Sequence, residues 1–238
     1  MTSLDKLKEI RSGAGRPATA GLADDIIQRF AAAGSDLETA IDEALDRFQA
    51  LTSEYPQQLA MDETAQIELI LERFVNFYHD DTVNPYVPLA ARGPWIVTAA
   101  GAVIHDSGGY GMLGLGHGPG PILDAMTRPH VMANIMTPSF SQVRLVHALL
   151  REVGHSLPGE CPFQRFLCLN SGSEAVTVAA RISDINAKLL TDPGGRHQGK
   201  PIKIMALKGA FHGRTDRPAQ FSDSTLESYN THLASFRD

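Results

Sequence analysis

The sequence has few cysteines and no long apolar run. Its 238 residues include two cysteines, Cys161 and Cys168, which do not make a disulfide framework. No stretch of about 18 apolar residues occurs, so no transmembrane helix is expected. Residues 1–16 are polar and lack the apolar segment of a signal peptide. We therefore expect a soluble protein of the reducing cytoplasm, with no membrane partner.

Several chemical signatures are also missing. The net charge is −6 and no cluster of five or more Lys and Arg occurs, which argues against nucleic acid as a partner. The nine histidines form no His-x₃-His pair and the cysteines no Cys-x₂-Cys pair, so no metal site is expected. No G-x-S-x-G elbow supports a serine hydrolase. What remains is an ordinary globular composition, 43% apolar and 20% charged, that can bury a core.

The first part of the chain has the pattern of a helical region. Apolar residues recur at helical spacing over residues 22–33, 36–51 and 62–78, with Ser35 as N-cap of the second helix. In the third helix, the residues expected to face a core are Ile67, Ile70, Leu71, Phe74 and Phe77. The polar residues 1–21 predict a short helix at most, followed by a flexible segment. We predict a helical N-terminal region over residues 1–83.

The pattern changes after residue 83. Two short β-like runs, 95–98 and 102–105, flank Ala-Ala-Gly and predict a hairpin. The glycine-rich segment that follows contains G-x-G-x-x-G at 109–114. It lacks the helix start and the acidic residue about 20 positions on that a dinucleotide site requires. A glycine-rich loop lining a site is the favoured interpretation. We assign the hairpin and this loop to a second region, residues 84–130.

The remaining residues, 131–238, predict the beginning of an α/β domain. Helices are expected over residues 139–153 and 173–190, and buried strands over 166–169 and 202–207. Helices that alternate with apolar strands are typical of a layered α/β sheet. Two strands cannot form an independently stable sheet, so the domain is predicted to be incomplete. Residues 216–238 show little regular pattern.

Two polar segments follow the two predicted strands. The first, NSGSEA at 170–175, precedes a helix, whose free N–H groups and positive dipole end can hold a phosphate. Ser171 and Glu174 also form a capping box, which alone would indicate only a well-capped helix. The second segment is AFHGRT at 210–215. Ligands of open α/β sheets bind beyond the carboxyl ends of strands, so the two segments together favour a ligand site.

These segments support a resemblance to a known family. Four segments, taken in chain order, resemble the class III aminotransferases. They are GAVIHD at 101–106, LGLGH at 113–117, and the segments at 170–175 and 210–215. These are pyridoxal phosphate enzymes of fold type I. The resemblance covers about residues 95–215. It implies that residues 131–238 begin a three-layer α/β/α large domain of that fold type.

The resemblance also implies roles for single residues. Gly172 and Ser173 match the turn that holds the cofactor phosphate, and Phe211 matches the aromatic side chain that stacks on the pyridine ring. His212 follows and is expected to help pack that face. Arg214 matches an arginine that binds a substrate carboxylate in some members, although a surface arginine is the alternative. The lysine of the Schiff base and the aspartate paired with the pyridine nitrogen are expected beyond Asp238.

The expected function follows from the resemblance. The parent protein would transfer an amino group between an amine or amino acid and a keto acid, as a homodimer, and these 238 residues alone would be inactive. Two alternatives remain open at this stage. One is another fold type I reaction, catalysed by an aminomutase, racemase or decarboxylase. The other is a non-catalytic half-fold that serves for binding or dimerisation.

Overall fold

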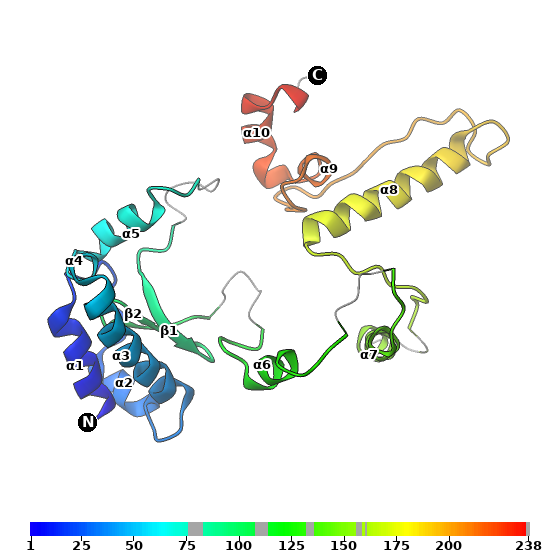
Figure 1. Ribbon diagram of the computed structural model, residues 1–238. Helices are drawn as coiled ribbons and strands as arrows, with labels where there is room; N and C mark the ends of the chain where they lie inside the picture. Colours follow the sequence, from blue (N-terminus) through cyan, green and yellow to red (C-terminus); the bar gives the residue numbers. More distant parts are fainter. Residues whose placement is uncertain (76–82, 108–113, 132–135, 156–158, 160, 237–238) are drawn as a thin grey trace. The chain divides into compact units, whose positions relative to one another are not determined.

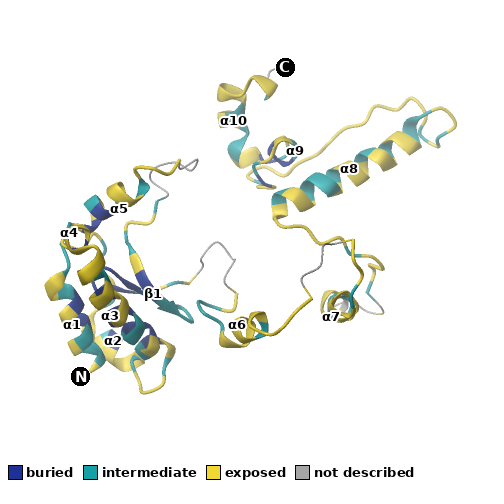
Figure 2. Cartoon of the chain, viewed as in Figure 1, coloured by how far each residue is buried: buried dark blue, intermediate teal, exposed yellow. Residues whose placement is uncertain are grey.

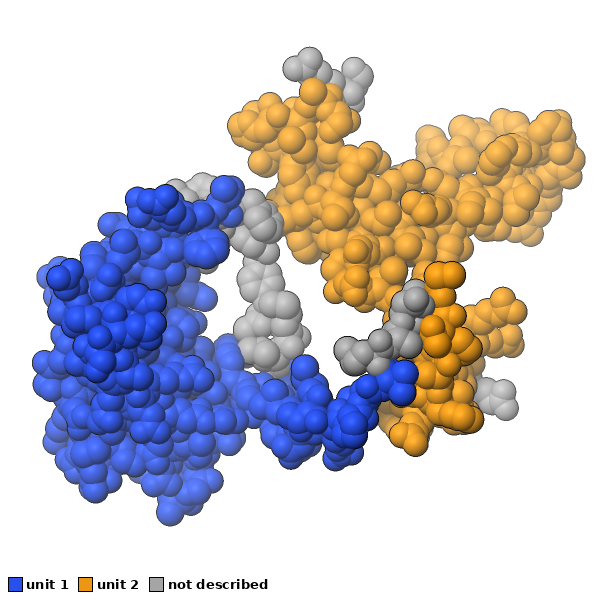
Figure 3. Space-filling view, viewed as in Figure 1, with its two compact units in different colours: residues 1–132 blue, residues 133–238 orange. Residues whose placement is uncertain are grey.

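The computed structural model describes residues 1–75, 83–107, 114–131, 136–155, 159 and 161–236. The chain forms two compact units, Met1–Met132 and Ala133–Asp238, coloured separately in Figure 3. Each unit is described here by itself. In the first unit, helical residues between 7 and 59 and hairpin residues between 89 and 103 contribute to one core. The division into regions 1–83, 84–130 and 131–238 stays a prediction.

The first unit combines helices with a small sheet (Figure 1). Its helices are α1 (Ser3–Gly13), α2 (Asp24–Phe30), α3 (Asp36–Glu54), α4 (Pro56–Leu59), α5 (Glu63–Leu71) and α6 (Gly120–Met126). The Ser35 hydroxyl accepts a hydrogen bond from the Glu38 N–H at 3.1 Å, so the predicted N-cap of α3 is confirmed. The short helix predicted within residues 1–21 is present as α1, which spans 11 residues and buries Leu7 and Ile10 completely.

The sheet of this unit has three antiparallel strands in the order β1 (Pro88–Arg92), β2 (Trp95–Thr98) and β3 (Val103–His105). Strands β2 and β3 are the predicted hairpin, with Trp95 opposite His105 and Val97 opposite Val103. Gly101 in the turn has a φ of +71°, a conformation that glycine adopts at low cost. The hairpin is therefore confirmed, and β1 extends it into a sheet. The core lies between this sheet and α1 and α3 (Figure 2).

Helix α5 differs from its prediction in which face it buries. Its buried residues are polar, Glu63 and Gln66, whereas Ile70 and Phe74 are exposed. The Glu63 carboxylate accepts backbone hydrogen bonds from Ala18 and Val87, both at 2.9 Å. These bonds explain the burial of Glu63, because each carboxylate oxygen has a hydrogen-bond donor in place of water. The two donors come from distant segments of the chain. Phe77, also expected in the apolar face, lies outside the described residues.

The second unit contains helices α7 (Phe140–Gly154), α8 (Gly172–Thr191), α9 (Asp216–Ala219) and α10 (Asp223–His232), and the 3₁₀-helix Ala234–Phe236. Helices α7 and α8 match their predictions to within one residue at each end. Helices α9 and α10 were not expected, because residues 216–238 show no apolar periodicity. Helix α10 buries none of its residues, which explains why its sequence carries so weak a signal.

The strands predicted over residues 166–169 and 202–207 are not formed. Neither segment has regular secondary structure, and apart from the half-buried Phe166 their apolar side chains are exposed, Met205 to 95%. A strand is stable only when its N–H and C=O groups pair with a neighbour, and no partner strand is present among the described residues of this unit. The described part of the chain is thus a mixed α/β structure whose antiparallel sheet lies in the first unit, and the three-layer α/β/α domain stays a prediction. None of the helices in the described part of the chain is long and apolar enough to span a bilayer.

Candidate functional site

The start of α8 has the predicted capping box. The Ser171 hydroxyl accepts a hydrogen bond from the Glu174 N–H at 3.2 Å, and the Glu174 carboxylate accepts from the N–H groups of Asn170 and Ser171 at 3.0 and 3.1 Å. The side chains of the capping box thus accept hydrogen bonds from the N–H groups of the two residues before α8 and of Glu174. It leaves the amides of Gly172 and Ser173, at the positive end of the helix dipole, for another acceptor.

The space around these two amides is open on one side. A Cβ atom added at Gly172 would meet no atom within 4 Å. Ser173 is half-buried and occupies the second position of the helix. A small anion such as a phosphate can therefore approach Gly172 and receive hydrogen bonds from backbone N–H and hydroxyl groups.

The structure brings the second segment against the first. Gly213 is buried and has a φ of +113°, and a Cβ atom there would lie 2.2 Å from the Ser173 Oγ and 3.0 Å from its Cα. Only a glycine permits this approach, because any side chain would displace α8 from the loop. The contact joins positions 40 residues apart and places residues 210–215 beside the first turn of α8.

The other predicted residues lie on this loop. Phe211 is 56% exposed, so its ring is accessible to a flat ligand. The Arg214 guanidinium carbon lies 5.9 Å from the centre of the Phe211 ring, within cation–π range. The side chain of His212 is exposed, and its backbone N–H donates to the Ser222 hydroxyl at 2.9 Å. All the predicted site residues thus belong to one unit, namely Gly172, Ser173, Phe211, His212 and Arg214. Their roles toward a ligand stay a prediction.

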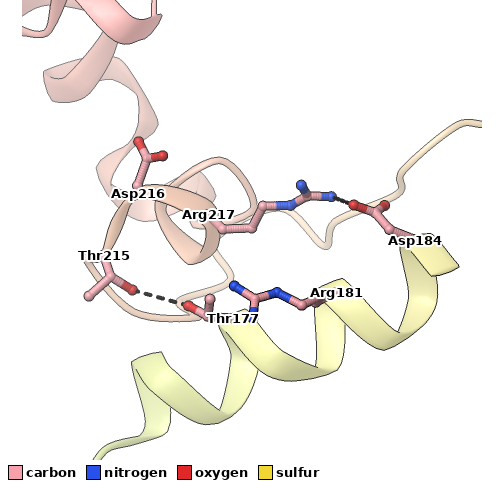
Figure 4. Close-up of a pocket in the computed structure, with 6 residues that line it drawn as sticks. All are labelled: Thr177, Arg181, Asp184, Thr215, Asp216 and Arg217. Atoms are coloured by element: carbon pink, nitrogen blue, oxygen red, sulfur yellow. Dashed lines mark hydrogen bonds and ion pairs between the residues drawn. The ribbon is translucent and has the colours of Figure 1, made fainter.

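Further along α8, two side-chain contacts hold the loop to the helix (Figure 4). The Thr177 and Thr215 hydroxyls lie 3.5 Å apart, and the Arg217 guanidinium forms an ion pair with the Asp184 carboxylate. A cavity of about 290 Å³ lies here, lined by Thr177, Arg181, Asp184, Thr215, Asp216 and Arg217. These contacts fix the far end of the loop one to three helical turns beyond Ser173.

Ser222, which is completely buried, was not expected from the sequence. Its hydroxyl bonds to the backbone on both sides of the contact with Ser173. The signal that could have revealed it is the Ser-Asp pair at 222–223, because serine often precedes the first residue of a helix. Recognising the helix itself would have been the necessary first step.

The two upstream segments of the resemblance meet in the first unit. The His117 ring bonds to the Asp106 carboxylate at 3.0 Å, which joins LGLGH to GAVIHD. Backbone bonds between Gly93 and His117 at 2.8 and 3.0 Å attach the same segment to the end of β1. Arg92 donates to the Gly118 carbonyl at 3.0 Å, and its bond to Glu43 raises the pKa of its guanidinium. Most of the G-x-G-x-x-G segment, residues 109–113, lies outside the described residues.

Metal ligands do not gather in the described part of either unit. No group of three or more His, Cys, Asp or Glu side chains there could hold a metal ion. The site around Ser173 therefore offers hydrogen-bond donors, a hydroxyl and an aromatic ring. That donor set suits a planar ligand with a phosphate group better than a metal ion.

Comparison with known proteins identifies the family. The sequence profile of the aminotransferase class-III family matches residues 77–236, a span that contains all four segments of the resemblance. The chain belongs to this family. Membership of this family supports amino-group transfer in broad terms. Neither this match nor the relative described below favours another reaction or a binding module.

A curated relative agrees with this assignment. The aminotransferase PigE of Serratia sp. (strain ATCC 39006) is 32% identical over 154 residues, which cover 63% of this chain and 16% of PigE. The chain thus spans only a small part of the length of this relative. No solved structure matches the chain.

Proposed function

We propose that this chain supplies the phosphate-binding turn and the stacking ring of a pyridoxal phosphate-dependent aminotransferase. The observation that supports this most strongly is the contact between Gly213 and Ser173. It assembles, from distant segments, an open helix N-terminus, a hydroxyl and an accessible aromatic ring. These are the groups that a cofactor with one phosphate and one flat ring requires.

Each residue would have a distinct task. The amides of Gly172 and Ser173 and the Ser173 hydroxyl would bind the phosphate, with the helix dipole adding attraction for its charge. Phe211 would stack on the pyridine ring, and His212 would pack beside that face. When bound, pyridoxal phosphate supplies the aldehyde that takes up the amino group and the ring that draws electrons from the reacting carbon. Arg214 would bind a carboxylate of the amino acid or keto acid.

The rest of the proposal follows from the family. A homodimer is expected, and the substrates are an amine or amino acid and a keto acid. These 238 residues should show no transamination with added cofactor, because the resemblance assigns the cofactor-bearing lysine to a position outside them. Turnover measured with these residues alone would contradict this expectation.

Binding of pyridoxamine 5′-phosphate tests the site directly, because this form of the cofactor needs no covalent link to a lysine. We expect the chain to bind it, and to bind pyridoxamine, which lacks the phosphate, at least tenfold more weakly. The difference arises because the charged phosphate receives the hydrogen bonds at the start of α8. Equilibrium dialysis with the fluorescence of each probe measures both dissociation constants. Equal affinity for the two probes, or binding of neither, would contradict the proposal.

Ser173→Ala should weaken binding of pyridoxamine 5′-phosphate about tenfold, because a hydrogen bond to a charged acceptor is lost. Binding of pyridoxamine should not change. Ser183→Ala is the matched control, because Ser183 is an exposed serine on the same helix. If the two variants bound the phosphorylated probe equally well, the Ser173 hydroxyl would have no part in phosphate binding.

A further inference from the structure

Ser222 holds the peptide units next to the contact between the loop and α8. Its hydroxyl oxygen accepts from the His212 N–H at 2.9 Å and lies 2.9 Å from the Gly213 carbonyl oxygen. The Pro218 carbonyl oxygen lies 3.0 Å away on the other side. A hydroxyl has one hydrogen, so the two carbonyls share it as acceptors. One side chain therefore fixes both the N–H of His212 and the C=O of Gly213.

This arrangement lies among buried residues. Ser222 is 0% exposed, and Gly213 and Pro218 are buried as well. Without the hydroxyl, the His212 N–H and the Gly213 carbonyl would lose this partner, which is costly beside buried groups, whereas the Pro218 carbonyl still accepts from the Phe221 N–H at 3.1 Å. The loop would then have to move to regain hydrogen bonds, and any such movement changes the distance between Gly213 and Ser173.

The beginning of α10 supports the same loop by bonds that do not involve the Ser222 side chain. The Gly209 N–H donates to the Asp223 carboxylate at 2.6 Å, and the Ser224 N–H donates to the Ala210 carbonyl at 3.3 Å. These bonds hold the part of the loop before Phe211. The part after Phe211, which contacts Ser173, is held by the Ser222 hydroxyl.

We propose that Ser222 is a positioning residue of the cofactor site: its hydroxyl sets the position of Gly213 against Ser173 and thereby the shape of the phosphate-binding turn. This inference rests on the proposed function. Ser222 does not touch the phosphate. It acts through the backbone of His212 and Gly213, which lie ten and nine residues before it in the sequence.

The experiment compares Ser222→Ala with Ser224→Ala in the 238-residue chain. Ser224 is an exposed serine two positions away whose backbone bond survives the substitution. Two quantities are measured: hydrogen exchange of the amides of residues 212–215, and the ratio of the affinities for pyridoxamine 5′-phosphate and pyridoxamine. We expect Ser222→Ala to speed exchange at least tenfold and to lower the affinity ratio about tenfold. Ser224→Ala should change neither quantity.

Three results would overturn the inference. Unchanged exchange in Ser222→Ala would show that the hydroxyl does not fix the loop. Faster exchange with an unchanged affinity ratio would show that the loop position does not shape the phosphate site. Faster exchange in α8 as well would show general unfolding in place of a local effect. Absence of binding in the unsubstituted chain would be a different result, because it contradicts the proposed function itself.

Discussion

Gly213→Ala is expected to abolish measurable binding of pyridoxamine 5′-phosphate. The added Cβ would lie 2.2 Å from the Ser173 Oγ, which can rotate away, but also 2.9 Å from its Cβ and 3.0 Å from its Cα, which cannot. The loop and the first turn of α8 must therefore separate. Alanine at a φ of +113° adds backbone strain of about 1–2 kcal/mol. We expect the dissociation constant to rise at least a hundredfold, measured by equilibrium dialysis.

Gly209→Ala is the matched control for this prediction. Gly209 lies in the same loop at a φ of +74°, but a Cβ there would meet no atom within 4 Å. The two substitutions share the backbone strain, and only the one at Gly213 adds the contact with Ser173. We expect Gly209→Ala to bind the probe within about threefold of the unsubstituted chain. If both variants lost binding equally, strain in the loop would explain the effect and the close contact would not.

The features that could be predicted from the sequence are local. The Ser35 cap, the box of Ser171 and Glu174 and the hairpin around Gly101 each depend on residues a few positions apart. Their side chains and backbones meet whenever the segment folds. The strands at 166–169 and 202–207 were predicted wrongly for the opposite reason. Apolar residues show that a segment suits a sheet, but a strand also needs a neighbouring strand, which a short pattern does not contain.

The same distinction applies to the candidate site. Gly172, Ser173 and Phe211 could be named from short motifs, although their roles stay a prediction. Ser222 could not, because its partners are backbone groups of His212 and Gly213, which every residue type offers. A hydrogen bond to a backbone group cannot be recognised from the residue type of that partner. The burial of Glu63 escaped prediction for this reason too, since it is stabilised by backbone N–H groups of two other segments.

Glu63→Leu should lower the free energy of unfolding of the first unit by about 3 kcal/mol. The carboxylate is completely buried and accepts from the N–H groups of Ala18 and Val87 at 2.9 Å and of Thr19 at 3.4 Å. Leucine fills a similar volume but accepts none of these bonds, so buried donors lose their partner. The loss is large for a domain whose total stability is typically 5–15 kcal/mol.

The measurement uses the only tryptophan of the chain. Trp95 is 9% exposed in the core of the first unit, so its fluorescence in urea reports the unfolding of that unit alone. The stability of Glu63→Gln should lie between those of the unsubstituted chain and Glu63→Leu, at a loss of about 1–2 kcal/mol. One acceptor oxygen remains in this variant, while the amide nitrogen faces another donor. Glu68→Gln, at an exposed position of the same helix, should change stability by less than about 0.5 kcal/mol. Equal losses for Glu63→Gln and Glu68→Gln would mean that the removal of a negative charge, and not the loss of the buried hydrogen bonds of Glu63, lowers the stability of the unit.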